Sequence, residues 1–462
     1  MTAFDEYFEK FREKDITVIG VGVSNVPLIR LLVRYGARVT ACDKKSAEAL
    51  GNVYPELTAL GVSFALGENY LSNLTGEYIF RTPGMHPENP ALQVARDNGS
   101  IITSEMEAFF AVCPCKIIAV TGSDGKTTTT TLIYEILKKS GYTCHLGGNI
   151  GTPLLAKVPA MKPEDFAIVE LSSFQLMTMQ KSPNIAAITN LAPNHLDVHK
   201  DMEEYIGAKK NIFLHQSAGD TLVLNADDAI SSAFQPESGV TLLQFSMEKP
   251  VQNGVFLAGS NICLAKDGNA ETIMRVSDIK IPGRHNVANY MTAAAVCARF
   301  VSTDDIFSVA KNFGGVEHRI ELVREFNGVR YYNDSIASSP TRTIAGLRSF
   351  SQKVILIAGG YDKKIPYDVI GPEILAHVKR LILVGPTAPL IQRATESAAG
   401  FAEHPIPITE FQEFYDAVCF ARDAAAEGDI VLLSPASASF DRFQNFAQRG
   451  NCFKKIVLSF SV

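Results

Sequence analysis

The segment Lys116–Leu137 constrains this chain more than any other stretch. An apolar run, Ile117–Val120, leads into a glycine-rich loop, Thr121–Thr127, and apolar residues then recur at helical spacing at Leu132, Ile133, Ile136 and Leu137. A strand, a glycine-rich turn and a helix N-terminus form a cradle for phosphate, because backbone N–H groups and the helix dipole face the anion. The segment therefore predicts a nucleotide-binding α/β domain.

The loop departs from the common pattern G-x-x-x-x-G-K-[ST]. Counting back from Gly125 places the usual first glycine at Val120, so the loop has the shorter form G-x-x-G-K-T. A G-K-T triplet alone is a weak signal, and a solvated glycine turn is the alternative interpretation. The strand before the loop and the helix after it favour nucleotide binding.

Length and composition limit the class of protein. The chain has 462 residues, and single hydrophobic cores stop growing at about 250–300 residues, so about three domains are expected. A net charge of −6 argues against non-specific binding to nucleic acid. No apolar run is long enough to cross a bilayer, and the charged amino end is unlike a secretory signal. We expect a monomeric cytoplasmic enzyme with reduced cysteines and no nucleic-acid or membrane partner.

Residues 1–105 are predicted to form a Rossmann-like domain. A strand at Ile16–Ile19 is followed by the turn Gly20–Asn25 and a helix, and a second strand ends at Asp43. Glycines at the turn and an acidic residue after the next strand are typical of a nucleotide site. Asn25, however, stands where the third glycine of the dinucleotide fingerprint would lie, so a tight turn without a ligand fits this motif equally well.

Residues 106–313 are predicted to form a central α/β domain of the P-loop ATPase type, with a small β appendage over residues 239–282. Glu170 lies near the end of the apolar strand Phe166–Leu171. A buried charge must be paired, so this carboxylate is well placed to hold Mg²⁺ beside the phosphate loop. His195 follows the next apolar strand, and is either a ligand at the same rim or a structural histidine.

Two other segments of this domain carry weaker signals. Tyr205–Phe213 has the pattern of an amphipathic helix, which places its lysines on the solvated surface. Asn286 is a natural N-cap for the alanine-rich helix Val287–Phe300. Asn289 in the first turn is a poor helix former, and indicates either a polar contact or exposed helix surface.

Residues 314–462 are predicted to form a doubly wound α/β domain. Apolar strands alternate with helices, and the strands close on small or polar residues, at Asn333–Ser335, Gly359-Gly360, Gly385–Thr387 and Pro435–Ser439. In such domains ligands bind at the carboxyl ends of the strands. We therefore expect a ligand at these loops.

The ordered set of motifs resembles the Mur ligases, the ATP-dependent amide-forming enzymes of peptidoglycan precursor synthesis. The resemblance spans Gly20 to Gly450, and joins the phosphate loop to Gly148–Gly151, Glu170–Ser173, Asn194–Asp197 and His318-Arg319. At the carboxyl end, Asn333–Ser335, Lys363 and Ser434–Gly450 resemble the members that add D-glutamate to UDP-N-acetylmuramoyl-L-alanine. The resemblance implies that the first domain binds UDP rather than a nicotinamide cofactor.

The family's chemistry is compatible with these residues. The resemblance implies that ATP phosphorylates a substrate carboxylate to an acyl phosphate, which the amine of D-glutamate attacks. It implies that Lys126 contacts the terminal phosphates, that Thr127 and Glu170 hold one Mg²⁺, and that His195 holds a second. Lys209 matches the family's carbamylated lysine, which as a carbamate would be an oxygen ligand for Mg²⁺.

The resemblance also implies binding roles in all three domains. Contacts to ATP are implied for Gly122, Ser123, Asp124, Gly125, Lys126, Thr127, Thr128, Asn286, Arg319 and Asp334. Contacts to the UDP-sugar are implied for Gly22, Val23, Ser24, Asp43, Lys44, Asn149 and Ser173. Contacts to D-glutamate are implied for His195, Ser338, Lys363, Ser439 and the backbone of Phe446.

One departure and three alternatives stay open at this point. Some family members carry a lysine after the Asn-Asp-Ser motif; Ile336 stands there in this chain, so no charged contact to the amino acid is assigned to that position. The alternatives are a Mur-type or folylpolyglutamate synthetase-like ligase with another acceptor, a nucleotide-binding switch without ligation, and a dinucleotide oxidoreductase. The Ser434–Gly450 stretch argues against another acceptor, and an oxidoreductase would need nicotinamide in the first domain.

Overall fold

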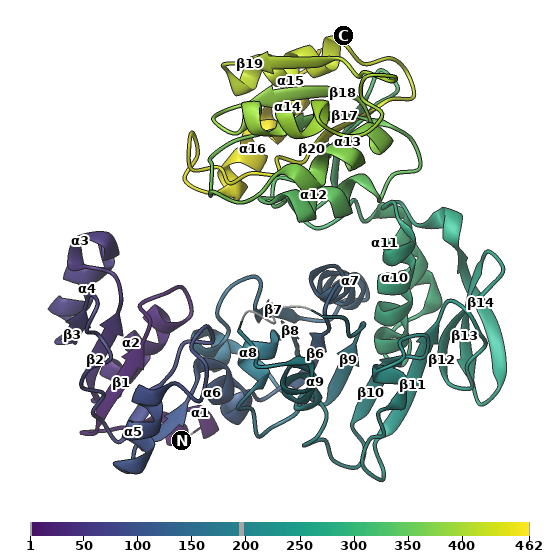
Figure 1. Ribbon diagram of the computed structural model, residues 1–462. Coiled ribbons are helices and arrows are strands. Elements are labelled where there is room, and N and C mark those ends of the chain that lie inside the picture. The colour runs from purple at the N-terminus through teal and green to yellow at the C-terminus, as the bar shows by residue number, and fades with distance from the viewer. Residues whose placement is uncertain (1, 194–197, 462) are drawn as a thin grey trace. The chain divides into compact units, whose positions relative to one another are not determined.

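The computed structural model describes residues 2–193 and 198–461, whose strands form three sheets (Figure 1). By contacts the chain divides into two compact units. The first comprises Met1–Val276 with Ala288–Val309, and the second comprises Ser277–Val287 with Ala310–Val462. The fold is α/β, as predicted, while the domain boundaries placed after residues 105 and 313 stay predictions.

The first sheet has the strand order β3-β2-β1-β4-β5, with all neighbours parallel, which is the Rossmann-like arrangement. Its strands are β1 (Asp15–Ile19), β2 (Arg38–Asp43), β3 (Ser63–Leu66), β4 (Tyr78–Phe80) and β5 (Ile101–Thr103). The helices of this segment are α1 (Ala3–Glu9), α2 (Asn25–Arg34), α3 (Ala47–Leu50), α4 (Val53–Ala59), α5 (Pro90–Asp97) and α6 (Glu105–Val112).

The central sheet has the order β14-β13-β12-β11-β10-β9-β6-β8-β7. Its strands are β6 (Lys116–Thr121), β7 (Cys144–Gly148), β8 (Phe166–Glu170), β9 (Ile185–Ile188), β10 (Thr221–Asn225), β11 (Thr241–Ser246), β12 (Gly254–Ala258), β13 (Asn261–Lys266) and β14 (Asn269–Arg275). The predicted β appendage corresponds to β11–β14. These strands continue the central sheet at one edge, where β11 pairs parallel with β10 and β13 pairs antiparallel with both neighbours.

The helices of the central region connect these strands. They are α7 (Lys126–Lys139), α8 (Ser173–Leu176), α9 (Met202–Lys210), α10 (Arg284–Cys297) and α11 (Thr303–Asn312), with short 3₁₀ turns at Leu155–Ala160, Ser231–Ala233 and Val276–Asp278. The helix expected at Val287 begins at Arg284, so the prediction that Asn286 caps it is wrong. Asn286 lies in the first turn, where its side-chain amide donates to the Pro282 carbonyl at 2.5 Å.

The elements beside the phosphate loop form as predicted. β6 is buried from Ile117 to Thr121, and α7 buries Leu132, Ile133, Ile136 and Leu137. Threonine is a poor helix former, because its hydroxyl competes for backbone groups. In α7 the hydroxyls of Thr130 and Thr131 donate at 2.8 Å to carbonyls four residues earlier, so the threonine-rich turns satisfy their own polar groups.

The third sheet has the order β15-β16-β20-β17-β18-β19, parallel except for β15 against β16. Its strands are β15 (Glu321–Phe326), β16 (Val329–Asn333), β17 (Val354–Ala358), β18 (Val378–Val384), β19 (Ile408–Phe411) and β20 (Ile430–Leu433). Its helices are α12 (Pro340–Leu347), α13 (Gly371–His377), α14 (Ala388–Glu396), α15 (Phe414–Asp423) and α16 (Phe446–Leu458), with a 3₁₀ turn at Asp368–Ile370. The doubly wound prediction is confirmed: separate apolar cores pack on the two sides of the central strands β16, β20, β17 and β18, which alternate their side chains between them.

Candidate active site

Two glycines allow the phosphate loop to fit between its neighbours. Gly122 has φ +147°, and a Cβ there would lie 1.9 Å from Thr189 Oγ1. Gly125, at φ +76°, starts α7, and a Cβ there would lie 2.3 Å from Asn289 Oδ1. Thr129 Oγ1 also donates to Asn289 Oδ1 at 3.3 Å, so the polar contact considered for Asn289 is present. Any side chain at either glycine would force the loop away from these supports.

Hydrogen bonds from the segment after β9 hold the loop in shape. The N–H of Ser123 donates to the Asn190 carbonyl and the N–H of Asp124 to the Asn190 side chain, both at 2.9 Å. Lys126 Nζ lies back over the loop, and donates to the carbonyls of Gly122 at 3.0 Å and Ser123 at 2.9 Å. Thr128 follows in α7 and is buried. The side chain of Lys126 thus occupies the loop's own carbonyl groups.

Glu170 meets the phosphate loop at the end of β8. The side chain is 2% exposed, and its two oxygens accept from Thr127 Oγ1 at 2.7 Å and from Asn149 Nδ2 at 2.8 Å. Gly148 lets Asn149 approach, because a Cβ at Gly148 would lie 2.2 Å from the Glu170 carbonyl. The structure therefore brings together three residues to which the sequence assigned roles in ATP, Mg²⁺ or UDP-sugar binding.

Lys209 is buried against the same loop. It is 1% exposed, and Nζ donates to the Gly122 carbonyl at 2.8 Å and to Thr121 Oγ1 at 3.2 Å. Burial lowers the pKa of Lys209 well below its ordinary value, and the ammonium of Lys126 lowers it further. The neutral amine is therefore favoured at this position.

Helical periodicity predicted that Lys209 lies on the solvated surface, and that prediction is wrong. The buried residues of α9 are Tyr205, Ala208 and Lys209, which share one face at i, i+3 and i+4, while Lys210 is only partly buried. Periodicity assigns lysine to solvent by residue type, so it misses a lysine that lies in line with buried neighbours. The alignment of Lys209 with Tyr205 was the signal that could have revealed it.

The turn after β1 lines a cavity of about 350 Å³. Gly22, Val23, Ser24, Asp43 and Lys44 all line it, which are the residues assigned to UDP from the first domain. Asp43 Oδ2 accepts from the N–H of Val21 at 2.7 Å and so fixes the turn. Asn25 stands at the position of the third glycine. Its side chain donates to the carbonyls of Ile19 and Gly20 at 2.9 and 3.0 Å, which stabilises the turn.

Arg81 links this cavity to α8. It directly precedes Thr82 and Pro83, which line the cavity, and it is 1% exposed. Its guanidinium donates at 3.0 Å to the Met85 carbonyl and at 2.9 Å to the Phe174 carbonyl and Thr178 Oγ1. Arg81 carries no sequence signal of its role, because an arginine at a strand end is typical of the surface. Ser173, the neighbour of Phe174, is 2% exposed and begins α8.

In the second unit, Asp334 follows β16. It is 4% exposed and accepts from Ser434 Oγ at 2.7 Å, and burial raises its pKa to about 7 although Arg319 acts to lower it. Arg319 lies between two residues with positive φ, His318 at 64° and Ile320 at 46°. Such backbone is strained for non-glycine residues and is enriched at functional sites.

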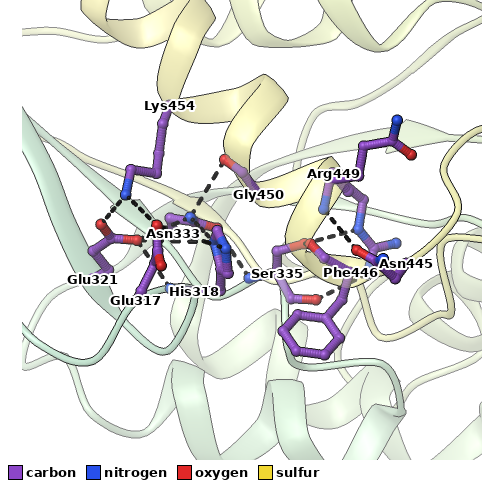
Figure 2. A network of polar contacts seen from close by, with 11 residues as sticks. Glu317, His318, Glu321, Asn333, Ser335, Asn445, Phe446, Arg449, Gly450 and Lys454 are labelled. Atoms are coloured by element: carbon purple, nitrogen blue, oxygen red, sulfur yellow. Dashed lines mark hydrogen bonds and ion pairs between the residues drawn. The ribbon is translucent and has the colours of Figure 1, made fainter. Parts of the chain in front are cut away.

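A network of polar contacts joins this loop to α16 (Figure 2). Asn333 lies 2.9 Å from His318 Nδ1 and donates to Glu321 at 3.1 Å, while Lys454 forms ion pairs with Glu321 and Glu317 (Figure 2). A Cβ at Gly450 would lie 2.3 Å from His318 Nδ1, so the glycine allows α16 to approach.

Arg449 forms the other half of this network. It is 3% exposed and donates at 3.0 Å to four acceptors, which are Ser335 Oγ and the carbonyls of Ser335, Ser437 and Ala438. Ser335 Oγ in turn donates to the Phe446 carbonyl at 2.8 Å (Figure 2). Arg449 was not predicted as a site residue, because one arginine in a polar stretch gives no sign of burial.

Four of the residues assigned to D-glutamate, Ser338, Lys363, Ser439 and Phe446, belong to this unit. The N–H of Tyr361 donates to the Ala438 carbonyl at 2.9 Å, which brings the Lys363 segment beside Ser439. Ser439 is 2% exposed, Lys363 is exposed and Ser338 is half-buried. Phe446 is the first residue of α16. His195, assigned to both Mg²⁺ and D-glutamate, lies outside the described residues.

Neither a membrane-spanning helix nor a cluster of metal-ligating side chains is found among the described residues. No helix within residues 2–193 and 198–461 is long and apolar enough to cross a membrane. In the same residues no group of three or more histidine, cysteine, aspartate or glutamate side chains is gathered as a metal site.

Comparison with solved structures supports the fold. The chain is 17% identical to the UDP-N-acetylmuramate-alanine ligase from Thermotoga maritima, with a TM-score of 0.58 over 96% of this chain and 99% of that chain. It is also 17% identical to a UDP-N-acetylmuramoyl-L-alanyl-D-glutamate--2,6-diaminopimelate ligase, with a TM-score of 0.55 over 96% and 93% of the two chains. At this level of identity the likeness concerns the fold.

Comparison of sequences is more specific. Residues 120–297 match the model of the Mur ligase middle domain, and residues 318–437 match the Mur ligase, glutamate ligase domain. A protein from Acetivibrio thermocellus named UDP-N-acetylmuramoylalanine--D-glutamate ligase is 53% identical over 462 residues, 99% of each chain. A protein of the same name from Clostridium novyi is 50% identical over 455 residues, 98% of each chain. The chain belongs to the Mur ligase family.

Proposed function

We propose that the protein joins D-glutamate to UDP-N-acetylmuramoyl-L-alanine, with conversion of ATP to ADP and phosphate, as a cytoplasmic step of peptidoglycan precursor synthesis. The observation that carries this proposal is the name shared by relatives that are 53% and 50% identical along nearly the whole chain. Mur ligases use ATP and Mg²⁺. The C-terminal match to a glutamate ligase domain supports an amino-acid acceptor at the third sheet.

The phosphate loop is proposed to bind ATP. Loop N–H groups and the N-terminus of α7 would face the phosphates, and Lys126 would exchange the carbonyls of Gly122 and Ser123 for the terminal phosphates. Phosphoryl transfer then depends on position and on charge neutralisation. The remaining ATP contacts are assigned to Asn286, Arg319 and Asp334, and rest on the family resemblance.

The residues at the end of β8 fit Mg²⁺. The Glu170 carboxylate and the Thr127 hydroxyl are hard oxygen donors 2.7 Å apart at the start of α7, and Mg²⁺ usually takes one or two protein ligands beside phosphates and water. Mg²⁺ bound there would neutralise the charge on the phosphates. The second site, at His195, rests on the resemblance alone.

Lys209 fits the proposed carbamate. A carbamate forms when a neutral amine attacks CO₂ and releases one proton, and the lowered pKa of Lys209 favours that neutral amine. The product is an anionic oxygen ligand in a place where an ammonium would repel Mg²⁺. The hydrogen bond from Lys209 Nζ to the Gly122 carbonyl supports a carbamate beside the phosphate loop.

The two substrates are proposed to bind through residues of different domains. The cavity at Gly22–Ser24 would hold UDP, with Asn149 and Ser173 next to the sugar. For D-glutamate, exposed Lys363 can pair with a carboxylate, and Phe446, as the first residue of α16, offers an N–H with no intrahelical acceptor.

Phosphate release tests the proposal directly. The enzyme is supplied with ATP, Mg²⁺ and UDP-N-acetylmuramoyl-L-alanine, and D-glutamate is omitted or replaced by L-alanine, lysine or meso-diaminopimelate. We expect sustained release of phosphate only with D-glutamate, and one new amide per phosphate. Equal release without any amino acid would contradict ligation, and equal turnover with another amino acid would contradict the assigned acceptor.

A further inference from the structure

Two of the eight cysteines lie in contact in the link between α6 and β6. Cys113 Sγ lies 3.5 Å from Cys115 Sγ, with only Pro114 between them in the chain. Either sulfur can donate the hydrogen between them, and all eight cysteines are free thiols in the structure. An S–S bond is about 2.05 Å long, so the two sulfurs need to approach by about 1.5 Å to form one.

The backbone of the link holds the two thiols near each other. The N–H of Cys113 donates to the Phe109 carbonyl at 2.9 Å, and Cys115 directly precedes the first residue of β6. Pro114 fixes its own φ and restricts the residue before it to extended backbone, and Cys113 has φ −64° and ψ 121°. Residues two apart have Cα atoms at most about 7 Å apart, which is near the range that a disulfide spans. The close approach of the sulfurs therefore follows from an anchored backbone.

The surroundings of the pair favour its reaction over that of other cysteines. The thiolate is the nucleophilic form of cysteine. The hydrogen shared with Cys113 lowers the pKa of Cys115, whereas burial raises the pKa of Cys42 to about 11 and that of Cys144 to about 12. Cys113 is half-buried and Cys115 is 6% exposed, so a small oxidant can reach the pair.

We propose that Cys113 and Cys115 form an oxidation site, at which hydrogen peroxide converts the two thiols to a reversible disulfide. One sulfur attacks the peroxide: an S–O bond forms, the O–O bond breaks, and a sulfenic acid and one water result. The second sulfur then attacks the first, an S–S bond forms, the S–O bond breaks, and the hydroxyl leaves with the remaining thiol proton as a second water. Two thiols and one hydrogen peroxide thus give one disulfide and two waters.

The short spacing makes this disulfide easy to reduce again. A ring that closes across a single intervening residue is strained, and strained disulfides are the labile ones. In reducing compartments disulfides are usually transient and redox-sensing. The pair therefore suits a reversible modification, and its chemistry is independent of the proposed ligase reaction.

Mass spectrometry of the full-length protein after peroxide treatment tests the inference. The protein is exposed to hydrogen peroxide, the peroxide is removed with catalase, and free thiols are alkylated in denaturant before digestion with trypsin. Cleavage after Arg96 and Lys116 gives the fragment 97–116, whose only cysteines are Cys113 and Cys115. We expect this fragment to lose two hydrogen atoms and take up no alkyl group, on the order of tenfold faster than Cys42 loses its alkylation. Dithiothreitol should restore two alkylated cysteines.

Matched variants separate this disulfide from other oxidation. Cys113→Ser leaves one thiol in the pair, so we expect oxidation of Cys115 to give a sulfenic acid that dimedone labels, in place of the disulfide. Cys144→Ser is the control, because the charges of Cys144 and Cys115 affect each other, and it should leave the mass change of fragment 97–116 as in the wild type.

The wild-type fragment decides the outcome even where a substitution disturbs folding. Addition of oxygen that dithiothreitol does not remove, without loss of the two hydrogen atoms, would overturn the inference. A cross-link from fragment 97–116 to the fragment that contains Cys144, or oxidation no faster than that of Cys42, would overturn it as well.

Discussion

Two buried basic side chains, Lys209 and Arg449, show how differently the two units stabilise such a group away from water. Lys209 in the first unit has two oxygen acceptors, whereas Arg449 in the second has four. Burial lowers the pKa of both, but that of Arg449 only to about 10, so its guanidinium stays charged at neutral pH. A lysine can lose its proton and react, whereas an arginine cannot. The first unit thus buries a reactive amine, whereas the second buries a guanidinium that stays charged and stabilises the loops it contacts.

The largest effect should come from removing the reactive group. We expect Lys209→Ala to lower turnover on the order of 100- to 1000-fold, as loss of one electrostatic contact in an active site does. The free energy of unfolding should also fall, by about 1–3 kcal/mol, because the Gly122 carbonyl and Thr121 Oγ1 lose a buried donor, so turnover is compared under conditions where both proteins are folded. Added short-chain carboxylates should restore part of the turnover by replacing the carbamate.

The neighbouring lysine is the matched control for that variant. Lys210 lies on the same helix with its ammonium 5.4 Å from the Phe234 ring, away from the phosphate loop. Lys210→Ala should keep turnover within about twofold, as surface changes usually do. Full activity of Lys209→Ala without added carboxylate would show that Lys209 is not a reactive group, and the contrast with Arg449 would be lost.

Replacing Arg449, by contrast, should lower the free energy of unfolding. Arg449→Met leaves the carbonyls of Ser335, Ser437 and Ala438 buried without their donor, and we expect unfolding to cost about 3 kcal/mol less. Urea unfolding followed by circular dichroism measures this loss. Arg442→Met is the control, because Arg442 is more exposed and pairs with Glu413 at 3.2 Å, and it should change stability by less than about 0.5 kcal/mol. Equal stability of the two variants would contradict the stabilising role of Arg449.

The buried carboxyl group of Asp334 in the second unit adds a pH dependence to the comparison. Burial raises the pKa of Asp334 from 3.8 to about 7, so between these values the folded chain keeps a proton that the unfolded chain has lost. The free energy of unfolding contributed by Asp334 therefore falls as pH rises from about 4 to about 7. Asp334→Asn should flatten this fall by about 3 kcal/mol across the window, measured by urea unfolding at several pH values. An unchanged pH profile would show that Asp334 titrates normally.

The fold could be predicted because its signals are local and repeated. The apolar strand at Ile117–Val120, the glycine turn and the periodic side of α7 each follow from neighbouring residues. The parallel sheets follow from strands that alternate with helices. The helix start at Arg284 was missed because helix ends depend on a few weak contacts, and Asn286 suited the N-cap as well as the first turn.

Residues of the site could be predicted only where a local sequence motif indicates their role. Glu170 stood out because a carboxylate in an apolar strand needs a partner. Lys209 was reached only through the family resemblance and Arg449 was not selected, because a buried polar residue has the same sequence appearance as an exposed one. Their burial depends on acceptors from distant segments: Gly122 is 87 residues from Lys209, and Ser335 is 114 residues from Arg449.

The contact between Gly125 and Asn289 has a consequence for the order in which the site can form. Asn289 supports the phosphate loop, yet the chain leaves the first unit at Ser277 and returns to it only at Ala288. A ribosome therefore finishes the loop long before it makes the residue that supports it. The nucleotide site is complete only after α10 has been synthesised, and cleavage after Val276 would separate the loop from that support.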